Sequence, residues 1–319
     1  MGESLRDLSD QYIISVDIGG TNIKSGIMSA SGELFSHAVH PTPAQEGGAA
    51  VLQELKRIIK AHLSEADQKG IAPKAIGVAT AGWVDSDTGR VIYASDNLPG
   101  WTGTEIGDEL RQAFDLPVAV ENDANAMAIA EHFFGAAKGV DDFICVTLGT
   151  GIGCGVFLDG KLRRGAHYLA GEFGHIQLVP DGLPCTCGKR GCLEVYGNAA
   201  ALLRYARDSF KSAKGVIEAA NGLDRTAIRA IETLARHLAE GCAGPIGLLD
   251  PSLLLLSGGL TQNNPLLLAS LKEELETRLL AKDVRKLRVE FSTQQYLGGI
   301  SGAAAVAFEK LTQIGFQEN

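Results

Sequence analysis

Short apolar runs alternate with amphipathic segments along most of the chain. The apolar runs predict buried strands at 12–17, 75–79, 118–120, 143–148 and 251–257. Apolar residues at three- and four-residue spacing, or long alanine- and leucine-rich stretches, predict helices at 49–66, 123–134, 199–212, 225–241, 265–279 and 300–313. Strands that alternate with helices are typical of the α/β class.

One unit of this pattern occurs twice. The strand at 12–17 is followed by Gly19-Gly20 and an apolar hairpin partner at 23–28. The strand at 143–148 is followed by Gly149-Thr150-Gly151 and a second arm at 154–158. Such a repeat predicts two structurally related halves.

Size and charge narrow the class of protein. The 319 residues suggest about two domains. With 29 Lys and Arg against 38 Asp and Glu, the net charge is −9, which disfavours nucleic acid as a partner. No apolar run reaches the ~18 residues of a membrane span, so we expect no membrane partner. Residues 1–11 are polar and resemble no signal peptide, so we expect a cytoplasmic protein.

The glycine turns suit a nucleotide. Glycine lets backbone amides approach phosphate oxygens, and a strand-end carboxylate can hold Mg²⁺. Three stretches fit and predict a site for ATP and Mg²⁺, formed by Asp17, Gly19, Gly20, Thr21, Asn22 and the nearby Lys24, then Gly149, Thr150 and Gly151, then Gly258 and Gly259. Any one glycine pair taken alone is more simply explained as a hairpin turn, and only the three stretches together favour a nucleotide site.

Three of the six cysteines cluster within eight residues. Cys185, Cys187 and Cys192 form C-x-C-x4-C, and His175 lies ten residues upstream. Three thiolates and one imidazole complete a tetrahedral shell with no open position, which predicts structural Zn²⁺. The alternative is a loop of free thiols, which would be chemically vulnerable.

Polar residues between a strand and a helix form the candidate catalytic centre. Asp123, in Glu121-Asn122-Asp123-Ala124-Asn125, is a candidate general base, with Asn122 to position a substrate. Asp123 could instead be only a helix N-cap. Glu172 and Glu194 flank the cysteine loop and suit sugar hydroxyls, although each could be a solvated glutamate. His175 could bind metal through one ring nitrogen and meet substrate through the other.

Together these motifs resemble the ROK family of sugar kinases. Asp17 to Asn22, Glu121 to Asn125, Gly149 to Gly153, Gly171 to His175 and Cys185 to Glu194 occur in the family's order, and the match covers residues 12–310. The resemblance implies an actin-like (ribonuclease H-like) two-domain α/β ATPase fold with the active site in the interdomain cleft. It implies an N-terminal domain over 1–122, completed by a helix over 300–319, and a C-terminal domain over 123–299 that carries the zinc loop.

The resemblance also implies roles for single residues. Asp123 takes the proton from a sugar hydroxyl, usually O6, as that hydroxyl attacks the γ-phosphate of ATP. Sugar contacts are implied for Gly82, Asn97, Asn122, Asp123, Glu172, His175 and Glu194, zinc ligation for His175, Cys185, Cys187 and Cys192, and a homodimer for the assembly. The segment Asn97 to Trp101 resembles that of glucose kinases, which makes glucose the favoured hexose.

Two positions depart from the family pattern. Ala81 stands where many members carry proline, in a loop that helps to shape sugar choice, so the substrate is left open. Cys154 replaces a usual glycine after the second glycine turn, where we expect little effect because cysteine is small. N-acetylmannosamine or N-acetylglucosamine kinases would keep the same catalytic and zinc residues, and a fructokinase is a further alternative. A sugar-responsive regulator without catalysis is the remote alternative. A DNA-binding repressor would need a helix-turn-helix, for which the eleven residues before Tyr12 leave no room.

Overall fold

The chain forms two compact units. The computed structural model describes residues 11–207, 209–294 and 297–315. Unit 1 comprises residues 1–135, 164–169 and 296–319, and unit 2 comprises residues 136–163 and 170–295. Unit 1 includes α3 (Asp123–Phe134), which packs on the last helix, whereas the sequence prediction begins the second domain at residue 123. Residues 1–10 and 316–319 of the predicted N-terminal domain lie outside the described residues.

Unit 1 is built on a mixed five-stranded sheet. Its order is β3 (Leu34–Pro41), β2 (Asn22–Ser29), β1 (Tyr12–Ile18), β4 (Pro73–Thr80) and β7 (Val118–Asn122). The first three strands pair antiparallel, and β1, β4 and β7 pair parallel. The hairpin predicted around Gly19 is confirmed as β1–β2. A small two-stranded sheet, β5 (Trp83–Asp85) with β6 (Arg90–Tyr93), follows β4.

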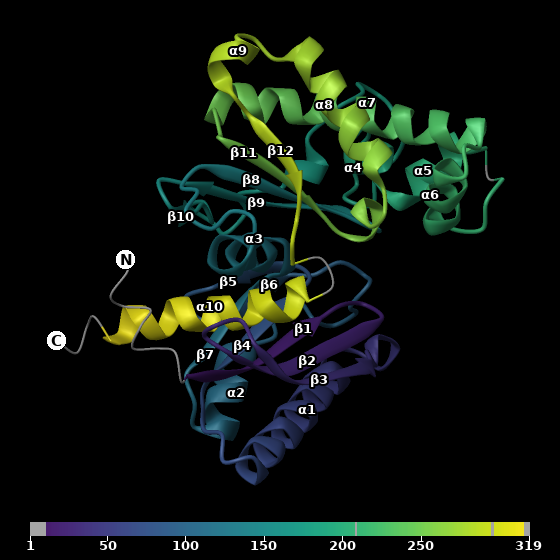
Figure 1. Cartoon of the computed structure of the whole chain (residues 1–319). Helices are drawn as coiled ribbons and strands as arrows, with labels where there is room; N and C mark the ends of the chain where they lie inside the picture. The colour runs from purple at the N-terminus through teal and green to yellow at the C-terminus, as the bar shows by residue number, and fades with distance from the viewer. Residues whose placement is uncertain (1–10, 208, 295–296, 316–319) are drawn as a thin grey trace. The chain divides into compact units, whose positions relative to one another are not determined.

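Helices cover both faces of this sheet (Figure 1). The helices α1 (Gly48–Gln68) and α2 (Ile106–Phe114) pack on the large aliphatic side chains of one face. The other face carries small residues and receives α3 and α10 (Gly298–Gly315). A Cβ on Gly77 would overlap the carbonyl of Ala303, so glycine permits the close approach of α10. Residues 301–308 of α10 are all buried, as expected for a helix that is apolar on every side.

Unit 2 repeats the strand arrangement of unit 1. Its sheet has the order β10 (Lys161–Leu162), β9 (Ile152–Leu158), β8 (Phe143–Leu148), β11 (Leu253–Ser257) and β12 (Arg288–Phe291). Again the first three strands pair antiparallel and the last three pair parallel. The predicted relation between the two halves is therefore confirmed at the level of topology.

α-Helices and short 3-10 helices (η) complete unit 2. They are η2 (Phe173–His175), α4 (Glu194–Gly197), α5 (Ala199–Tyr205), α6 (Ala213–Asn221), α7 (Arg225–Leu249), η3 (Gly259–Thr261), α8 (Pro265–Arg278) and α9 (Lys282–Arg285). The core forms where α7 and α8 pack on the aliphatic side chains of β8, β9 and β11. Leu234 and Leu238 of α7 are almost fully buried in it.

Two predicted helix boundaries were wrong. The helix predicted over 199–212 ends at Tyr205, because Arg207 takes a left-handed conformation and Ser212 starts α6 by accepting from the Gly215 amide. The helix predicted over 225–241 continues to Leu249 and contains Pro245. The pattern also missed the edge strand β3, in which exposed positions alternate, and several short elements, among them β5, β6, β10, α2 and β12.

No helix among the described residues combines the length and apolar character needed to cross a membrane.

Candidate active site

The candidate catalytic residues of unit 1 lie at one edge of its sheet. Ile18 of β1 pairs with Thr80 of β4, and Thr80 pairs with Asn122 of β7. All three parallel strands therefore end in the same row, and the segments that leave them are brought together. In open α/β sheets this carboxyl edge is where ligands bind.

Asn122, not Asp123, caps α3. The Asn122 side-chain oxygen accepts from the amides of Ala124 (2.9 Å) and Asn125 (3.1 Å). Its Nδ2 donates to the Gly82 carbonyl (2.9 Å) and to Asp123 Oδ1 (3.1 Å). The amide is thus fully occupied by protein partners and positions its neighbours in this conformation. The alternative interpretation of Asp123 as a mere cap does not apply.

The Asp123 carboxylate is held by one oxygen. Both the Ala124 amide (2.9 Å) and Asn122 Nδ2 donate to Oδ1, which leaves Oδ2 as the oxygen available for a proton. The residue reaches solvent, yet the protein around the carboxylate removes much of its hydration and raises its pKa to about 6, with repulsion from Asp17 adding to the rise. A base with a pKa near neutrality suits proton abstraction from a hydroxyl.

The first glycine turn presents free amides. The Gly19 amide donates to the Asn22 carbonyl (3.0 Å), and the Thr21 carbonyl accepts from Thr42 (2.9 Å). The amides of Gly20 and Thr21, both exposed, have no acceptor among the described residues. Successive unpaired amides of this kind form a concave site for an anion.

Asp17 lies at the end of β1 beside this turn. Lys24 Nζ stands 4.0 Å from its Oδ2. Burial raises the pKa of Asp17, and the charge of Lys24 partly opposes the rise. A Cβ on Gly299, at the start of α10, would overlap the Asp17 carboxylate, so the helix terminus approaches the carboxylate closely. The predicted Mg²⁺-binding carboxylate therefore has a confined position.

Gly82 and Asn97 also lie at this edge. Gly82 has a φ of 105°, and a Cβ there would meet the Tyr93 carbonyl at 2.5 Å. Asn97 is exposed and lies against Gly20, since a Cβ on Gly20 would stand 3.6 Å from that of Asn97. The buried Trp101 anchors this segment by donating from Nε1 to Thr80 Oγ1 (3.0 Å).

The second glycine turn, in unit 2, resembles the first. The Gly149 amide donates to the Gly151 carbonyl (3.0 Å). Among the residues that the structure describes, nothing accepts from the amides of Thr150 and Gly151. The carbonyls of Gly149 and Thr150 accept from Ala199 N–H (2.9 Å) and Asn198 Nδ2 (3.0 Å), so the turn is held from behind.

The third glycine pair packs against the second turn. Gly258 has a φ of 95°, and a Cβ there would overlap the backbone of Leu148, the residue before Gly149. Gly259 has open space where its Cβ would stand. The two nucleotide-binding stretches predicted for unit 2 are therefore adjacent.

The predicted zinc ligands form one cluster. One ligand atom from each of His175, Cys185, Cys187 and Cys192 lies within 4.8 Å of the other three. Cys187 Sγ is 3.6 Å from Cys192 Sγ, and Cys185 Sγ is 3.7 Å from His175 Nδ1. Two sulfur ligands of a tetrahedral Zn²⁺ stand about 3.8 Å apart at Zn–S ≈ 2.3 Å, so these residues fit the ion.

The cluster includes the predicted sugar-binding residue His175, and the predicted sugar-binding carboxylates Glu172 and Glu194 lie beside it. His175 directs Nδ1 to Cys185, and its Nε2 lies 3.8 Å from Glu172 Oε2. Glu194 Oε1 is 3.8 Å from Cys185 Sγ, while its Oε2 accepts from the Ile152 amide (3.0 Å). Glu194 thus links the cysteine cluster to the end of the second glycine turn.

Sequence reasoning missed two features of this site. Gly298-Gly299, at the start of an apolar helix, is a further glycine pair that does not follow a strand, so the pattern of glycines at strand ends does not include it. Arg164 pairs with Glu121, which lies two residues before the candidate base. Arg164 and Glu121 are 43 residues apart in the chain, so no local sequence pattern indicates that they pair.

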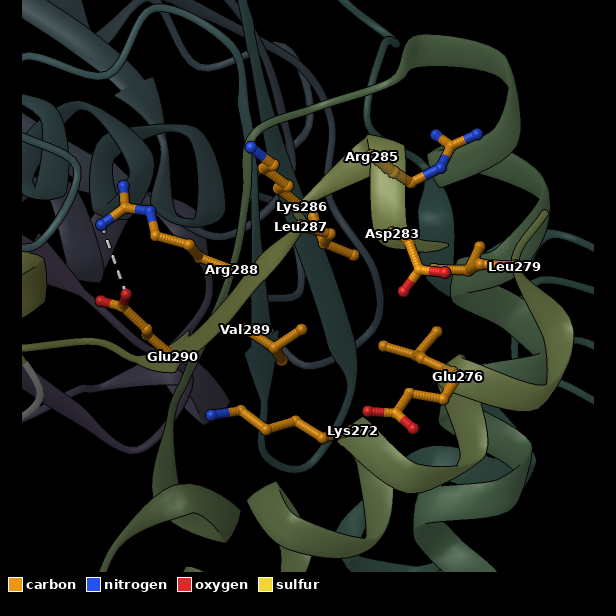
Figure 2. Close-up of a pocket in the computed structure, with 11 residues that line it drawn as sticks. Lys272, Glu276, Leu279, Asp283, Arg285, Lys286, Leu287, Arg288, Val289 and Glu290 are labelled. Carbon is orange, nitrogen blue, oxygen red and sulfur yellow. Dashed lines mark hydrogen bonds and ion pairs between the residues drawn. The ribbon is translucent and has the colours of Figure 1, made fainter. Parts of the chain in front are cut away.

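The cavity in Figure 2 lies elsewhere in unit 2, among α8, α9 and β12. It has a volume of about 440 Å³ and mixed charge, with Lys272 and Glu276 of α8 at one end and Lys286 at the other. Arg288 is paired with Glu290 at 3.3 Å, and Arg285 turns away from the space toward Asp250. None of the predicted site residues lines this cavity.

Comparison with known proteins agrees with this arrangement. The model of the ROK family matches residues 13–310. A glucokinase of Halalkalibacterium halodurans is 33% identical over 298 residues, which cover 86% of this chain and 88% of the relative.

Solved structures are similar over nearly the whole chain. A ROK glucokinase from Streptomyces griseus, in complex with glucose and AMPPNP, has a TM-score of 0.81 and 35% identity, covering 93% of this chain and 99% of its own. A Listeria monocytogenes protein provisionally assigned as an N-acetylmannosamine kinase has a TM-score of 0.80 and 27% identity, covering 94% and 99%.

Proposed function

The chain belongs to the ROK family, and from that premise we propose that it transfers the γ-phosphoryl group of ATP to O6 of a hexose, with glucose as the preferred substrate. Its fold is the actin-like ATPase fold, and it is an ATP-dependent sugar kinase. One observation carries the assignment of the base: Asn122 caps α3, and among the described residues no hydrogen-bond partner reaches Asp123 Oδ2 at the carboxyl edge of the sheet.

In the proposed reaction Asp123 acts as the general base. Oδ2 accepts the proton of the sugar O6 hydroxyl as that oxygen attacks the γ-phosphorus. The bond between the γ-phosphorus and the bridging oxygen of ADP breaks, and the products are the hexose 6-phosphate and ADP. Phosphoryl transfer depends mainly on positioning and electrostatics. The pKa of Asp123, about 6, leaves the carboxylate mostly ionised at neutral pH and still basic enough to help.

The glycine turns bind the nucleotide in this proposal. The amides of Gly20 and Thr21 in unit 1, and of Thr150 and Gly151 in unit 2, lack acceptors in the described part of the chain and donate to phosphate oxygens. Asp17 is the carboxylate that would hold Mg²⁺, which would offset phosphate charge. Gly258 and Gly259 leave room for close contact with the nucleoside.

Unit 2 supplies the groups that select the sugar. Glu172 and Glu194 accept hydrogen bonds from sugar hydroxyls, and His175 Nε2 faces the same side as Glu172. His175, Cys185, Cys187 and Cys192 would hold a structural Zn²⁺, whose chemistry is limited to fixing the loop that carries these carboxylates. In unit 1, Asn97 contacts the sugar while Gly82 and Asn122 position Asp123.

A coupled ADP-release assay with ATP and Mg²⁺ tests the function. Glucose, mannose, fructose, N-acetylmannosamine and N-acetylglucosamine are compared at equal concentration. Turnover that is strongest on glucose supports the proposal, and Asn97→Ala then raises the KM for glucose. Preference for an N-acetyl sugar keeps the mechanism but moves the substrate and directs attention to Ala81. Sugar binding without ADP release on any sugar would favour the regulator.

The assembly is part of the same proposal. We expect a homodimer that works in the cytoplasm, where ATP is available. Sedimentation velocity at micromolar concentration checks the assembly, and a single monomeric species would contradict it.

A further inference from the structure

A buried carboxylate lies two residues before the candidate base in the chain. Glu121, the residue before Asn122 on β7, is 1% exposed. Its Oε1 accepts from the Asn122 amide (2.9 Å) and from Asn125 Nδ2 (3.1 Å). One partner, Asn122, precedes Asp123 in the chain and the other, Asn125, follows it. Glu121 therefore contacts both the end of β7 and the first turn of α3, between which the base lies.

Arg164 neutralises this carboxylate. Arg164 Nε donates to Glu121 Oε2 at 2.6 Å, and Arg164 Nη2 donates to Glu309 Oε2 of α10 at 3.3 Å. One guanidinium thus joins the end of β7 to the last helix of unit 1. A charge-assisted contact to a buried carboxylate is strong, and removing one partner leaves a buried charge uncompensated.

Arg164 belongs to a short segment with an unusual course. Residues 164–169 pack in unit 1, although the chain on both sides of them belongs to unit 2. The segment is fixed at its other end by Tyr168, whose hydroxyl donates to Asp87 Oδ2 (2.6 Å). Directly after it the chain runs into Gly171-Glu172 and on to His175, the predicted sugar-binding stretch.

We propose that Arg164 is a positioning residue for the base Asp123, acting through Glu121 and Asn122. The ion pair fixes the junction of β7 and α3, and Asn122 passes this restraint to Asp123 Oδ1 through its Nδ2. The inference rests on the proposed kinase function and adds a residue that neither the glycine turns nor the sugar-binding motifs contain.

The test compares two adjacent arginines. Arg164→Gln removes the charge and the fork, Arg164→Lys keeps the charge but not the two-nitrogen geometry, and Glu121→Gln removes the other partner. Arg163→Gln is the matched control, because Arg163 pairs only with Asp159 in the described structure and Asp159 is 84% exposed. The kcat, the KM for the hexose, the melting temperature and the hydrogen exchange of amides 122–125 are measured for each.

We expect Arg164→Gln to lower kcat about 10- to 100-fold, because misplacing a catalytic group by a fraction of an ångström to 1 Å has effects of that size. The KM for the hexose should change less than about 3-fold, amides 122–125 should exchange faster, and Arg164→Lys should recover part of the rate. The double variant of Arg164→Gln with Glu121→Gln should lose less than the product of the single losses, since both act through one contact.

Several results would overturn the proposal. A kcat of Arg164→Gln equal to that of Arg163→Gln, or a loss explained by unfolding alone, excludes a positioning role. If Arg164→Gln does not fold, a wild-type kcat in Arg164→Lys has the same meaning. If the wild-type enzyme releases no ADP with any sugar, the proposed kinase function is wrong. The positioning inference is tested separately by hydrogen exchange: if amides 122–125 exchange at the same rate in Arg164→Gln as in the wild type, that inference is wrong too.

Discussion

The two glycine turns have the same backbone plan and different supports. Each follows the first strand of its sheet and leaves two successive amides without acceptors among the described residues. In unit 1 the neighbouring carboxylates are Asp17 and Asp123, and Asp123 is held through one oxygen only. In unit 2 the neighbouring carboxylate is Glu194, which is bound to the turn itself through Ile152.

This difference shows how two units of the same topology can serve different purposes in one enzyme. In unit 1 the carboxylates of Asp17 and Asp123 are partly dehydrated, and their pKa values are raised. Groups with such shifted pKa values are typical of catalytic sites. In unit 2 the carboxylate of Glu194 accepts from a backbone amide and lies beside the cysteine cluster. A carboxylate held in this way suits the binding of a substrate hydroxyl. The fold is shared, and the side chains at the strand ends decide the role.

The largest effect should come from the base. Asp123→Asn should fold, bind sugar and lose about 10²- to 10⁴-fold in kcat, because general-base catalysis contributes that much. The same change in unit 2, Glu194→Gln, should mainly raise the KM for the sugar, since the amide oxygen still accepts from Ile152. Steady-state kinetics separate the two, with Asp67→Asn on the exposed face of α1 as control. Equal kcat losses in both units would break the comparison.

Metal removal should affect unit 2 selectively. Chelation, or Cys187→Ser, should release about one Zn²⁺ per chain and lower the melting temperature, because structural zinc contributes directly to folding. The KM for the sugar should rise more than kcat falls. Metal analysis and thermal melts check this, with Cys242→Ala, a buried thiol outside the cluster, as control. Absence of bound metal in freshly purified protein would contradict the zinc assignment.

Adjacent glycines in unit 2 offer a matched pair. Gly258→Ala places a Cβ in a left-handed conformation against the backbone of Leu148 and should destabilise the protein by about 2–3 kcal/mol. Gly259→Ala meets open space and should change stability little. Urea unfolding compares them. If both variants unfolded at the same urea concentration, the packing of the third pair on the second turn would be wrong.

The acidic limb of the rate profile should report Asp123. Only the ionised carboxylate can take the proton, so kcat/KM should fall about tenfold per pH unit below pH about 6, the pKa of Asp123. An ordinary aspartate would keep its activity down to about pH 4. Measuring kcat/KM from pH 4.5 to 8 locates the limb, and a flat profile across pH 6 would exclude Asp123 as the titrating base.

The smallest expected effect is acid destabilisation through His62 in unit 1. His62 is buried, Nε2 lies 2.8 Å from Ser25 Oγ, and the titratable side chains around it are Glu65, His37 and His40. Burial outweighs the attraction of Glu65 and lowers the pKa of His62 in the folded state. The unfolded chain therefore binds more protons below about pH 6.5, and stability should fall as the pH drops from there through the folded pKa.

The size of that loss follows the pKa difference. Each unit between the unfolded and folded values corresponds to about 1.4 kcal/mol of stability. Unfolding free energies of the wild type and of His62→Gln between pH 5 and 7.5 measure it, with the exposed His167→Gln as control. Parallel curves for wild type and His62→Gln would show that His62 does not titrate in this way.

Local signals in the sequence predicted much of the fold. The helix Asp123–Phe134 and the strand Phe143–Leu148 agree with the prediction to the residue, because Asn122 caps one and glycine ends the other. The helix over 199–212 was wrong because one left-handed residue and the Ser212 cap outweigh an apolar pattern. Edge strands such as β3, with alternating exposed residues, give little apolar signal.

The same distinction applies to the candidate site. The cysteine cluster and the glycine turns could be predicted because their residues lie close together in the chain. The contact of Glu194 with Ile152 spans 42 residues and that of Arg164 with Glu121 spans 43, and only the fold reveals such pairs. The cap by Asn122 was also missed, since Asn122 and Asp123 are both good capping residues and their order does not show which one caps.

The last helix has a consequence for how the protein is made. α10 covers the small-residue face of β1 and β4, strands that a ribosome completes more than 200 residues earlier. At about 5–20 residues per second, the first strand waits on the order of 15–60 s for its partner helix. Residues 136–163 and 170–295 emerge before that helix and can fold while unit 1 is still incomplete. The beginning of the chain is therefore among the last parts to become native, and its uncovered sheet face is where a nascent chain of this protein would need a chaperone.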